Sequence, residues 1–322
     1  MPMSLRIIYM GSTDFSVGPL AMLMDHDYTI AAVVTVPDKP AGRSQKLKIS
    51  PVKAFALDRH IPVLQPEDLK EDAFVSQLRK LEPDLQVVVA FRILPEIVWM
   101  IPPLGTFNLH ASLLPQYRGA APINWVLING ETETGVTTFF LNQKVDTGKI
   151  LFQTKLDIRP DETAGVLHDR LMGAGSLLVL DTVRAIERGN AEVTDQQILI
   201  SNDHTLRKAP KISREDCLLN WSDSCLAIHN RIRGLSPDPG AYFLFSKSGK
   251  DAFPLKIFRS RPWLIPSDQP PGLITTDQKT YLGVTTPDGI IYLEEVQLPS
   301  KKRMPVKEFL RGFTVDPNLR LL

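Results

Sequence analysis

Residues 85–91 read LQVVVAF, and residues 105–110 read GTFNLH. Both are short apolar runs rich in β-branched or aromatic residues, which is the pattern of buried β-strands. Similar runs occur at residues 5–10, 29–36 and 135–142. Stretches with apolar residues three and four positions apart lie between several of them, as expected when crossover helices join parallel strands. The sequence therefore predicts an α/β domain with an open, mostly parallel sheet and flanking helices.

The flanking helices are predicted from the same periodicity. Ser50 precedes Pro51, a pair typical of an N-cap followed by proline at the first helical position. Residues 149–158 are predicted to add an edge strand, and residues 163–189 to form one long helix that closes the domain. The shorter helices are predicted at residues 19–25, 50–60 and 66–81.

The character of the sequence changes near residue 190. Residues 190–210 are polar and lack a sustained period, which predicts a linker that winds across the surface. After an amphipathic helix at 224–235, short alternating segments separated by Pro and Gly predict a small, OB-like β-barrel. Its predicted strands are residues 242–245, 253–258, 272–276, 281–286 and 289–298. The expected organisation is a first domain at 1–189, a linker at 190–210 and a C-terminal β-barrel domain at 211–322.

Composition argues against several classes of protein. The chain has 322 residues, enough for two domains that each bury a core. With 43% hydrophobic residues, 23% charged residues and a mean hydropathy of -0.06, neither a disordered chain nor a membrane protein is expected. No apolar run approaches the roughly 18 residues that span a bilayer, and the N-terminus lacks a secretory-signal pattern, so we expect a cytoplasmic protein. Cys217 and Cys225 fit neither a disulfide framework nor a zinc site, and reduced thiols are expected.

Charge is unevenly distributed along the chain. Residues 1–200 carry 19 Lys and Arg against 23 Asp and Glu, whereas residues 201–322 carry 18 against 13. Because Lys and Arg can replace the counterions of phosphates, the basic C-terminal part permits a polyanionic partner such as a nucleic acid. It does not require one.

Several common motifs are missing or out of context. GSTDF at residues 11–15 lacks both the three glycines of a dinucleotide fold and the Gly-Lys-Ser/Thr of a P-loop, so neither NAD nor ATP is expected. The Asp-Thr-Gly triplet at 146–148 also marks aspartic proteases, but here it occurs once, before Lys149 and inside an α/β pattern. The six histidines show no paired spacing, and no metal is expected.

Asn108 and His110 end the predicted strand at 105–110. Residues i and i+2 of a strand point to the same face, and open α/β sheets bind ligands at the carboxyl ends of their strands. An amide and an imidazole are therefore expected side by side in a crevice. The alternative is that the pair only satisfies backbone groups of nearby loops. Likewise, residues 111–125, ASLLPQYRGAAPINW, read either as a rigid loop that shapes a pocket or as the lead-in to a helix.

Together, Asn108, His110, SLLPQYRG at 112–119 and Asp146 within VDTG resemble the formyltransferase family that uses 10-formyltetrahydrofolate. Each string is short, but their order and separation are specific when taken jointly. Three further stretches are similar to the branch of the family that acts on methionyl initiator tRNA: residues 37–53, 209–213 and 298–304.

The resemblance implies a Rossmann-like formyltransferase domain and a tRNA-binding β-barrel domain. It also implies attack by the methionyl α-amino group on the formyl carbon of 10-formyltetrahydrofolate. In that reaction Asn108 would donate to the oxyanion, His110 would handle protons, and Asp146 would pair with His110 and accept the amine proton. The residues implied in folate binding are Ser112, Leu113, Leu114 and Pro115.

The tRNA contacts implied by the resemblance are basic residues. Without the resemblance, the basic residues at 37–53 would indicate only a surface exposed to solvent. In relatives this loop reaches into the acceptor end of the tRNA, and Arg43 is the matching arginine. The expected tRNA-binding residues are Arg43, Lys46, Lys48, Lys208, Lys211, Lys301, Lys302 and Arg303. A monomer is expected.

The sequence leaves two rival functions open. A formyltransferase acting on a nucleotide-linked amino sugar would keep the same Asn, His and Asp and need no basic C-terminal domain. An RNA-binding module would use the α/β domain as a scaffold, which gives no reason for those three residues to occur together. The loop at 90–95 also departs from the family, being one residue shorter and placing Arg92 where relatives have a Gly-Leu type sequence.

Overall fold

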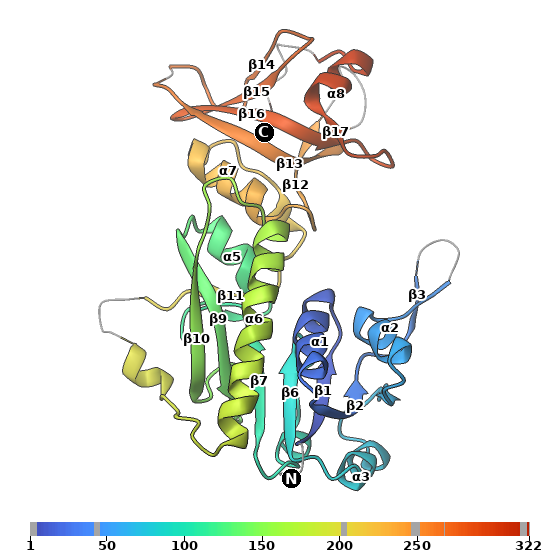
Figure 1. Ribbon diagram of the computed structural model, residues 1–322. Helices are drawn as coiled ribbons and strands as arrows, with labels where there is room; N and C mark the ends of the chain where they lie inside the picture. The colour runs from blue at the N-terminus through green and yellow to red at the C-terminus, as the bar shows by residue number, and fades with distance from the viewer. Residues whose placement is uncertain are drawn as a thin grey trace. The chain divides into compact units, whose positions relative to one another are not determined.

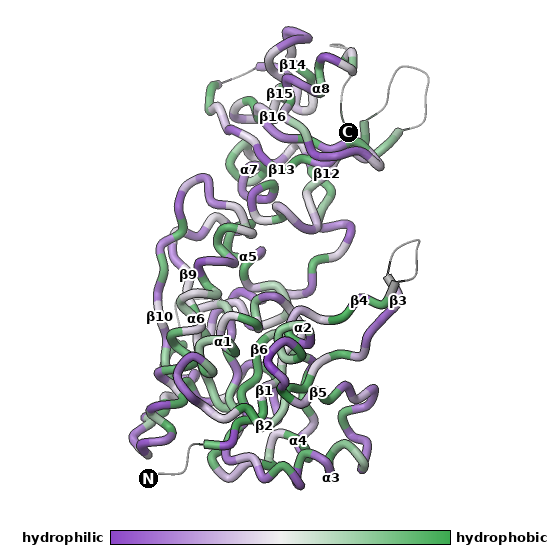
Figure 2. Tube along the Cα trace, turned by 45° about the vertical axis from the view of Figure 1, so that its right-hand side comes forward, coloured by the Kyte–Doolittle hydropathy of each residue, from purple (hydrophilic) through white to green (hydrophobic). Residues whose placement is uncertain are grey.

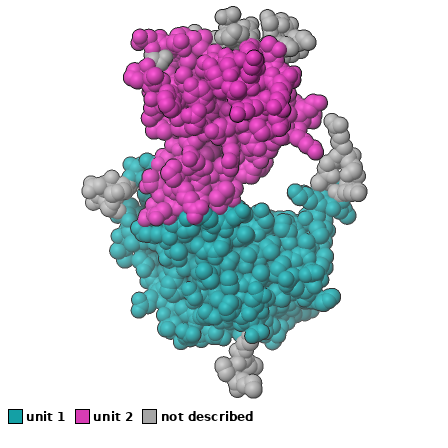
Figure 3. All heavy atoms as spheres, turned by 45° about the horizontal axis from the view of Figure 1, so that its top comes forward, with its two compact units in different colours: residues 1–119, 134–156, 168–208 teal, residues 120–133, 157–167, 209–322 magenta. Residues whose placement is uncertain are grey.

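The computed structural model describes residues 5–41, 46–200, 205–245, 252–266, 268–315 and 321. The chain divides into two compact units (Figure 3). Unit 1 comprises residues 1–119, 134–156 and 168–208, and unit 2 comprises residues 120–133, 157–167 and 209–322. Unit 2 thus includes two short segments that precede residue 189 in the chain.

Unit 1 is built on a sheet with strand order β10-β9-β7-β6-β1-β2-β5 (Figure 1). The pairs β1–β2, β1–β6, β2–β5 and β6–β7 are parallel, and β7–β9 is antiparallel. The predicted open, mostly parallel sheet is confirmed, with the strand at 149–158 at its edge. The strands are β1 (Arg6–Gly11), β2 (Thr29–Val34), β5 (Val63–Leu64), β6 (Leu85–Val89), β7 (Thr106–His110), β9 (Glu133–Phe140) and β10 (Ile150–Asp157).

Burial explains the continuous apolar runs of the central strands. All five residues of β6 are buried, because helices cover both faces of a parallel sheet. Figure 2 shows the hydrophobic stretches of β1 and β6 lying together inside the unit. The N-cap prediction is confirmed, since the Ser50 hydroxyl accepts a hydrogen bond from the Lys53 N–H at 3.0 Å. The helical segments are η1 (Asp14–Ser16), α1 (Val17–Asp25), α2 (Pro51–Asp58), α3 (Asp72–Lys80), α4 (Glu96–Trp99) and α6 (Ala164–Glu187).

The long helix α6 lies along β7 (Figure 1). A Cβ atom at Gly175 of α6 would lie 2.7 Å from the Leu109 side chain, so the glycine allows this close approach without displacing Leu109. The predicted helix at 163–189 is confirmed, and it supports the strand that carries Asn108 and His110.

A short hairpin lies within the basic stretch at 37–53. It consists of β3 (Lys39–Ala41) and β4 (Lys46–Lys48), which pair antiparallel. At its base, Lys53 Nζ contacts the Asp38 carboxylate at 2.5 Å and donates to Gln65 Oε1 at 2.7 Å. Lys53 is therefore bound to partners within the protein, whereas the described hairpin lysines, Lys39 and Lys48, are exposed.

The segment at 190–210 includes η2 (Gln196–Leu199) and β11 (Lys208–Ala209), and β11 pairs with β8 (Arg118–Gly119). It does not simply wind across the surface, because Gln196 is buried.

Unit 2 contains an antiparallel half-barrel sheet with order β12-β13-β16-β15-β14, and β17 pairs with β16. The predicted small C-terminal β-barrel domain is confirmed in this form. Its strands are β12 (Ala241–Phe245), β13 (Phe253–Leu264), β14 (Ile274–Thr276), β15 (Leu282–Thr286), β16 (Gly289–Gln297) and β17 (Met304–Pro305). Its helical segments are α5 (Pro122–Ile128), η3 (Glu215–Cys217), α7 (Cys225–Gly234) and α8 (Val306–Gly312).

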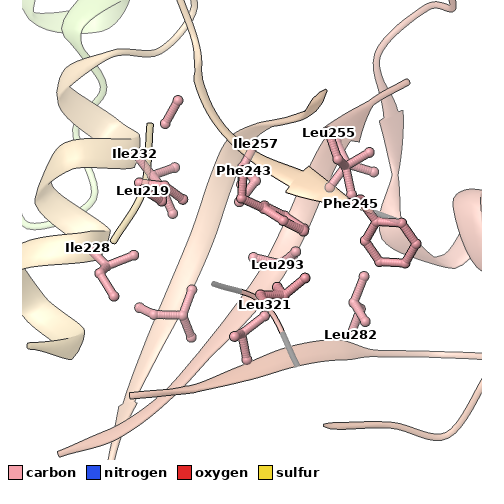
Figure 4. Packing of buried hydrophobic residues seen from close by; sticks show 14 of the residues in the cluster. Leu219, Ile228, Ile232, Phe243, Phe245, Leu255, Ile257, Leu282, Leu293 and Leu321 are labelled. Carbon is pink, nitrogen blue, oxygen red and sulfur yellow. The ribbon is translucent and has the colours of Figure 1, made fainter. Parts of the chain in front are cut away.

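The core of unit 2 lies between α7 and this sheet (Figure 4). Phe243 and Phe245 of β12 point inward with Ile257 of β13, as the alternation of the strands predicts. Trp221, 2% exposed, packs edge-on against Phe243 with ring centroids 5.4 Å apart. Cys217 is a free, buried thiol in the same core, and burial raises its pKa.

Candidate functional site

Asn108 and His110 lie at the carboxyl end of β7. Asn108 stands opposite Val88 of the parallel strand β6, and Val89 in turn stands opposite Gly11 of β1. The carboxyl ends of these three parallel strands therefore meet at one edge of the sheet, where such folds bind ligands. Asn108 is half-buried and His110 is 6% exposed. The structure thus brings both predicted side chains to the same face of one strand end.

The His110 ring is oriented by the loop that follows it. Its Nε2 lies 2.9 Å from the Tyr117 carbonyl oxygen. Because a carbonyl only accepts, Nε2 carries the proton, and Nδ1 is the ring nitrogen left to accept or exchange one. The Tyr117 N–H donates to the Arg207 carbonyl at 2.7 Å, so the residue whose carbonyl orients the ring is itself held by the segment at 190–210.

The Asn108 amide has no hydrogen-bond partner within the part of the chain that the structure describes. Buried and half-buried amides usually satisfy their donors in the protein. Here the N–H groups stay available to a bound carbonyl or oxyanion. This favours a ligand-facing role over the alternative in which Asn108 serves a nearby loop.

Asp146 lies in the loop between β9 and β10, with a backbone φ of +54°. Its Oδ2 accepts a hydrogen bond from the Gly119 N–H at 3.0 Å. Its contacts within the described residues do not include a direct ion pair with His110, so the carboxylate and the imidazole are positioned by different backbone groups. A Cβ atom at Gly148 would lie 1.6 Å from the Phe140 carbonyl oxygen, which explains the glycine of the VDTG sequence.

The loop at 112–119 is fixed to the sheet by the side chains of Thr137 and Gln153. Thr137 Oγ1 of β9 donates to the Ser112 carbonyl at 2.6 Å and accepts from the Leu114 N–H at 3.2 Å. Gln153 Nε2 of β10 donates to both Thr137 Oγ1 and the Leu114 carbonyl. The loop is therefore rigid up to Gly119, and α5 begins three residues later, so both expectations for this stretch describe part of it.

The residues expected to bind folate lie in this fixed loop. Ser112, Leu114 and Pro115 are buried, and Leu113 is half-buried. The Ser112 hydroxyl donates to the Gln116 carbonyl at 2.7 Å. Their side chains therefore contribute mainly to the shape and rigidity of the loop.

Gln196 joins the two loops of the site. Its Nε2 donates to the carbonyls of Asp146 and Gly148 at 3.0 and 2.8 Å. Its Oε1 accepts from Arg118 Nε and Nη2 at 3.1 and 2.6 Å. Burial lowers the pKa of the Arg118 guanidinium, and the Asp146 charge opposes that effect. Gln196 was not predicted from the sequence, because a single buried glutamine in a polar segment gives no periodic signal.

The loop at 90–95 is tied to a neighbouring segment. Arg92 Nη1 donates to the Glu67 carbonyl at 2.9 Å, and Nη2 donates to the Pro66 carbonyl at 2.8 Å. Burial lowers the pKa of this guanidinium. Arg92 therefore serves as a link between two loops.

Most of the expected tRNA-binding side chains are free at the surface. Lys48, Lys208, Lys211, Lys301 and Lys302 are exposed. Arg303 differs, because its Nη2 lies 3.3 Å from Glu295 Oε2 and its guanidinium stacks 3.7 Å above the Phe258 ring. Arg43 lies outside the described residues; Lys46 belongs to β4, but its side chain is not described.

Two further features bear on cofactors and membranes. Within the described ranges, no group of three or more His, Cys, Asp and Glu residues is arranged to hold a metal ion. Of the helices in the same ranges, none combines the length and apolar character needed to cross a bilayer.

Comparison with family models gives two matches. The model described as "Formyl transferase" matches residues 6–183, and the model described as "Formyl transferase, C-terminal domain" matches residues 211–314. Among curated relatives, a methionyl-tRNA formyltransferase of Bacteroides thetaiotaomicron is 47% identical over 318 residues, covering 98% of each chain. A methionyl-tRNA formyltransferase of Flavobacterium johnsoniae is 46% identical, covering 98% of this chain and 99% of the relative.

Solved structures at lower identity share the fold. HypX from Aquifex aeolicus, in complex with tetrahydrofolic acid, superposes with a TM-score of 0.62 at 19% identity over 97% of this chain. This chain spans about half of HypX, 49% of its length. The sugar 3N-formyl transferase WlaRD, with dTDP and 5-N-formyl-THF, gives a TM-score of 0.63 at 20% identity, covering 92% of this chain and 99% of WlaRD.

Proposed function

This chain belongs to the formyl transferase family, and on that premise we propose that it transfers a formyl group to the α-amino group of methionyl-tRNA. It is a formyl-transferring enzyme. The observation that supports methionyl-tRNA as the acceptor is the 47% identity, over 98% of both chains, with a methionyl-tRNA formyltransferase. Asn108 and His110, side by side at the carboxyl end of β7, supply a site of the required chemistry.

We propose 10-formyltetrahydrofolate as the formyl donor and initiator methionyl-tRNA as the acceptor. The folate in the HypX structure supports a folate donor for the fold, and the exposed lysines support a polyanionic acceptor. Initiator methionyl-tRNA is used in translation initiation, so we propose that the enzyme works in the cytoplasm. We also propose that it is a monomer.

In the proposed reaction a bond forms between the methionyl nitrogen and the formyl carbon, and the bond from that carbon to folate N10 breaks. One proton leaves the attacking amine and one is delivered to the leaving nitrogen, so the reaction needs no redox partner. The Asn108 amide, which has no partner among the described residues, is suited to donate to the oxyanion that develops on the formyl oxygen.

His110 and Asp146 divide the proton transfers. Because His110 Nε2–H is bound to the Tyr117 carbonyl, we assign proton exchange to Nδ1. Asp146 Oδ2 accepts from the Gly119 N–H, which leaves Oδ1 to take the amine proton directly or through water. The attacking amine is itself a competent nucleophile once neutral, so no covalent enzyme intermediate is required.

Substitution of these three residues tests the assignment. We expect Asn108→Ala, His110→Ala and Asp146→Ala each to fold and to lose at least about 100-fold in kcat, because each removes a group that acts in the transition state. Steady-state formylation assays and circular dichroism measure the two properties. Near-normal turnover in any one variant would remove that residue from the scheme.

We propose a catalytic domain at 1–189, a linker at 190–210 and a tRNA-binding β-barrel domain at 211–322. The limits of the two family models, 6–183 and 211–314, support these boundaries. We assign folate contacts to the loop of Ser112, Leu113, Leu114 and Pro115. The proposed tRNA-binding residues are Arg43, Lys46, Lys48, Lys208, Lys211, Lys301, Lys302 and Arg303.

One assay tests the proposed function. The protein is incubated with 10-formyltetrahydrofolate and either methionylated initiator tRNA, uncharged tRNA or an amino-sugar nucleotide, and formylated products are detected. Formylation of the charged tRNA alone is expected. Formylation of the sugar alone would keep the chemistry and reject the acceptor, and no transfer to either would reject the folate-dependent reaction.

A further inference from the structure

Gln196 is a buried amide in a polar segment. It is 1% exposed, although its neighbour Gln197 is exposed. A primary amide offers two N–H donors and two acceptor lone pairs. Gln196 uses all four, toward the carbonyls of Asp146 and Gly148 and toward two nitrogens of Arg118. An apolar side chain could fill the same space but could not form these four hydrogen bonds. We therefore expect the role of Gln196 to depend on its hydrogen bonds.

The backbone around Gln196 directs its side chain inward. Thr194 and Ile150 exchange two backbone hydrogen bonds of 2.8 Å, which anchors the segment beside the start of β10. Asp195 then caps η2, and its side chain accepts from the Gln197 N–H at 2.9 Å. These contacts fix Gln196 at the base of the loop that carries Asp146.

The Asp146 loop needs such an anchor. At φ +54°, Asp146 occupies the left-handed region that a residue with a side chain adopts rarely. Gln196 holds the carbonyls on both sides of Thr147, and it holds Arg118, the residue before Gly119. Gly119 is the residue whose N–H donates to the Asp146 carboxylate. Gln196 and the Asp146–Gly119 hydrogen bond thus join the same two chain segments.

We propose that Gln196 is a positioning residue for the formyl transfer, which holds the Asp146 carboxylate in place by clamping its loop to Arg118 and Gly119. This inference rests on the proposed function. It assigns one buried side chain of the linker, Gln196, to the catalytic apparatus. A second residue of the linker at 190–210 also contacts the site, because the Arg207 carbonyl accepts a hydrogen bond from the Tyr117 N–H in the loop at 112–119.

The informative substitution is Gln196→Glu. Glutamate has the same length and keeps an oxygen toward Arg118, but it replaces the amide nitrogen with an oxygen that faces two carbonyl oxygens. The two donated hydrogen bonds become repulsive contacts, and the Asp146 loop must move. Gln197→Glu is the matched control, because it adds the same charge one residue away on an exposed side chain.

Each variant is assayed with methionyl-tRNA and 10-formyltetrahydrofolate beside the wild type, and its folding is followed by circular dichroism and thermal unfolding. For Gln196→Glu we expect kcat to fall about 10-fold to 100-fold, as a displaced catalytic group does, while KM for methionyl-tRNA changes less than about threefold. Gln197→Glu should match the wild type in both parameters.

The outcomes separate the inference from the proposed function. An inactive wild type would reject the proposed function itself. An active wild type, with Gln196→Glu equal to Gln197→Glu in kcat, would overturn the positioning role alone. If Gln196→Glu does not fold, the shorter amide in Gln196→Asn is measured by the same criteria. Failure of both to fold, with Gln197→Glu folded, would assign Gln196 to stability and also overturn the proposal.

Discussion

Replacing Gly148 by alanine tests how tightly the Asp146 loop is set against β9. The added Cβ would lie 1.6 Å from the Phe140 carbonyl oxygen, whereas real Cβ atoms essentially never approach closer than 3.0 Å. The backbone at residue 148 must therefore retreat by 3.0 minus 1.6, or about 1.4 Å. Phe140 is held by the pairing of β9 with β7, so the loop is the part that moves.

A shift of this size in the loop should displace the Asp146 carboxylate and slow the reaction. Asp146 is two residues from Gly148, and a misplacement of about 1 Å can cost about 100-fold in rate. We expect kcat of Gly148→Ala to fall about 100-fold, together with a loss of about 1–3 kcal/mol in the free energy of unfolding from overpacking. Formylation kinetics and urea unfolding measure the two effects.

Gly173→Ala is the matched control. Gly173 lies in α6, and its added Cβ would meet no atom within 4 Å. Alanine is the better helix former by up to about 1 kcal/mol, so this variant should be as active as the wild type and slightly more stable. A kcat for Gly148→Ala within about threefold of the wild type would refute the link between loop position and catalysis.

Three further results are expected. Thr137→Val should lower the free energy of unfolding by about 1–3 kcal/mol more than Thr134→Val. The Thr137 hydroxyl bonds the Ser112 carbonyl and the Leu114 N–H, whereas the buried Thr134 hydroxyl has no partner among the described residues. Equal losses for the two variants in urea unfolding would contradict this prediction. Burial and the charge of Arg233 lower the pKa of His229, so the unfolded chain binds a proton at His229 more readily than the folded chain. The free energy of unfolding should therefore fall as the pH drops below about 6.5. His229→Gln should flatten this pH dependence between about pH 5 and 7.5, and an unchanged pH dependence would show that His229 is not its cause. Joint replacement of Lys301 and Lys302 by alanine should reduce the slope of log Kd for tRNA against log salt by about 1–2, whereas an unchanged slope would remove both from the interface.

Much of the fold could be predicted because its signals are local. The run at β6 is apolar at nearly every position since both faces of the strand are covered, and Ser50 marks the start of α2 through a hydrogen bond to a residue three positions away. Elements with too few residues to show a period were missed. β5 consists of Val63 and Leu64, and α8 is a helix of seven residues that directly follows a strand.

The site could be predicted only in part for a related reason. Asn108 and His110 are two residues apart on one strand, so their placement follows from strand geometry. The hydrogen bonds that fix the rest join residues far apart in sequence, with a separation of 27 between Gly119 and Asp146 and of 50 between Asp146 and Gln196. No local pattern encodes these pairings, because they arise only when the sheet brings the loops together.

The packing of Trp221 against Phe243 has an optical consequence. Of the four tryptophans in the chain, Trp125, Trp221 and Trp263 belong to unit 2, and only Trp99 belongs to unit 1. Trp221 is enclosed by apolar side chains, so its emission should lie at short wavelength until that core opens to water. Intrinsic fluorescence should therefore follow unit 2 far more closely than unit 1, which carries Asn108, His110 and Asp146.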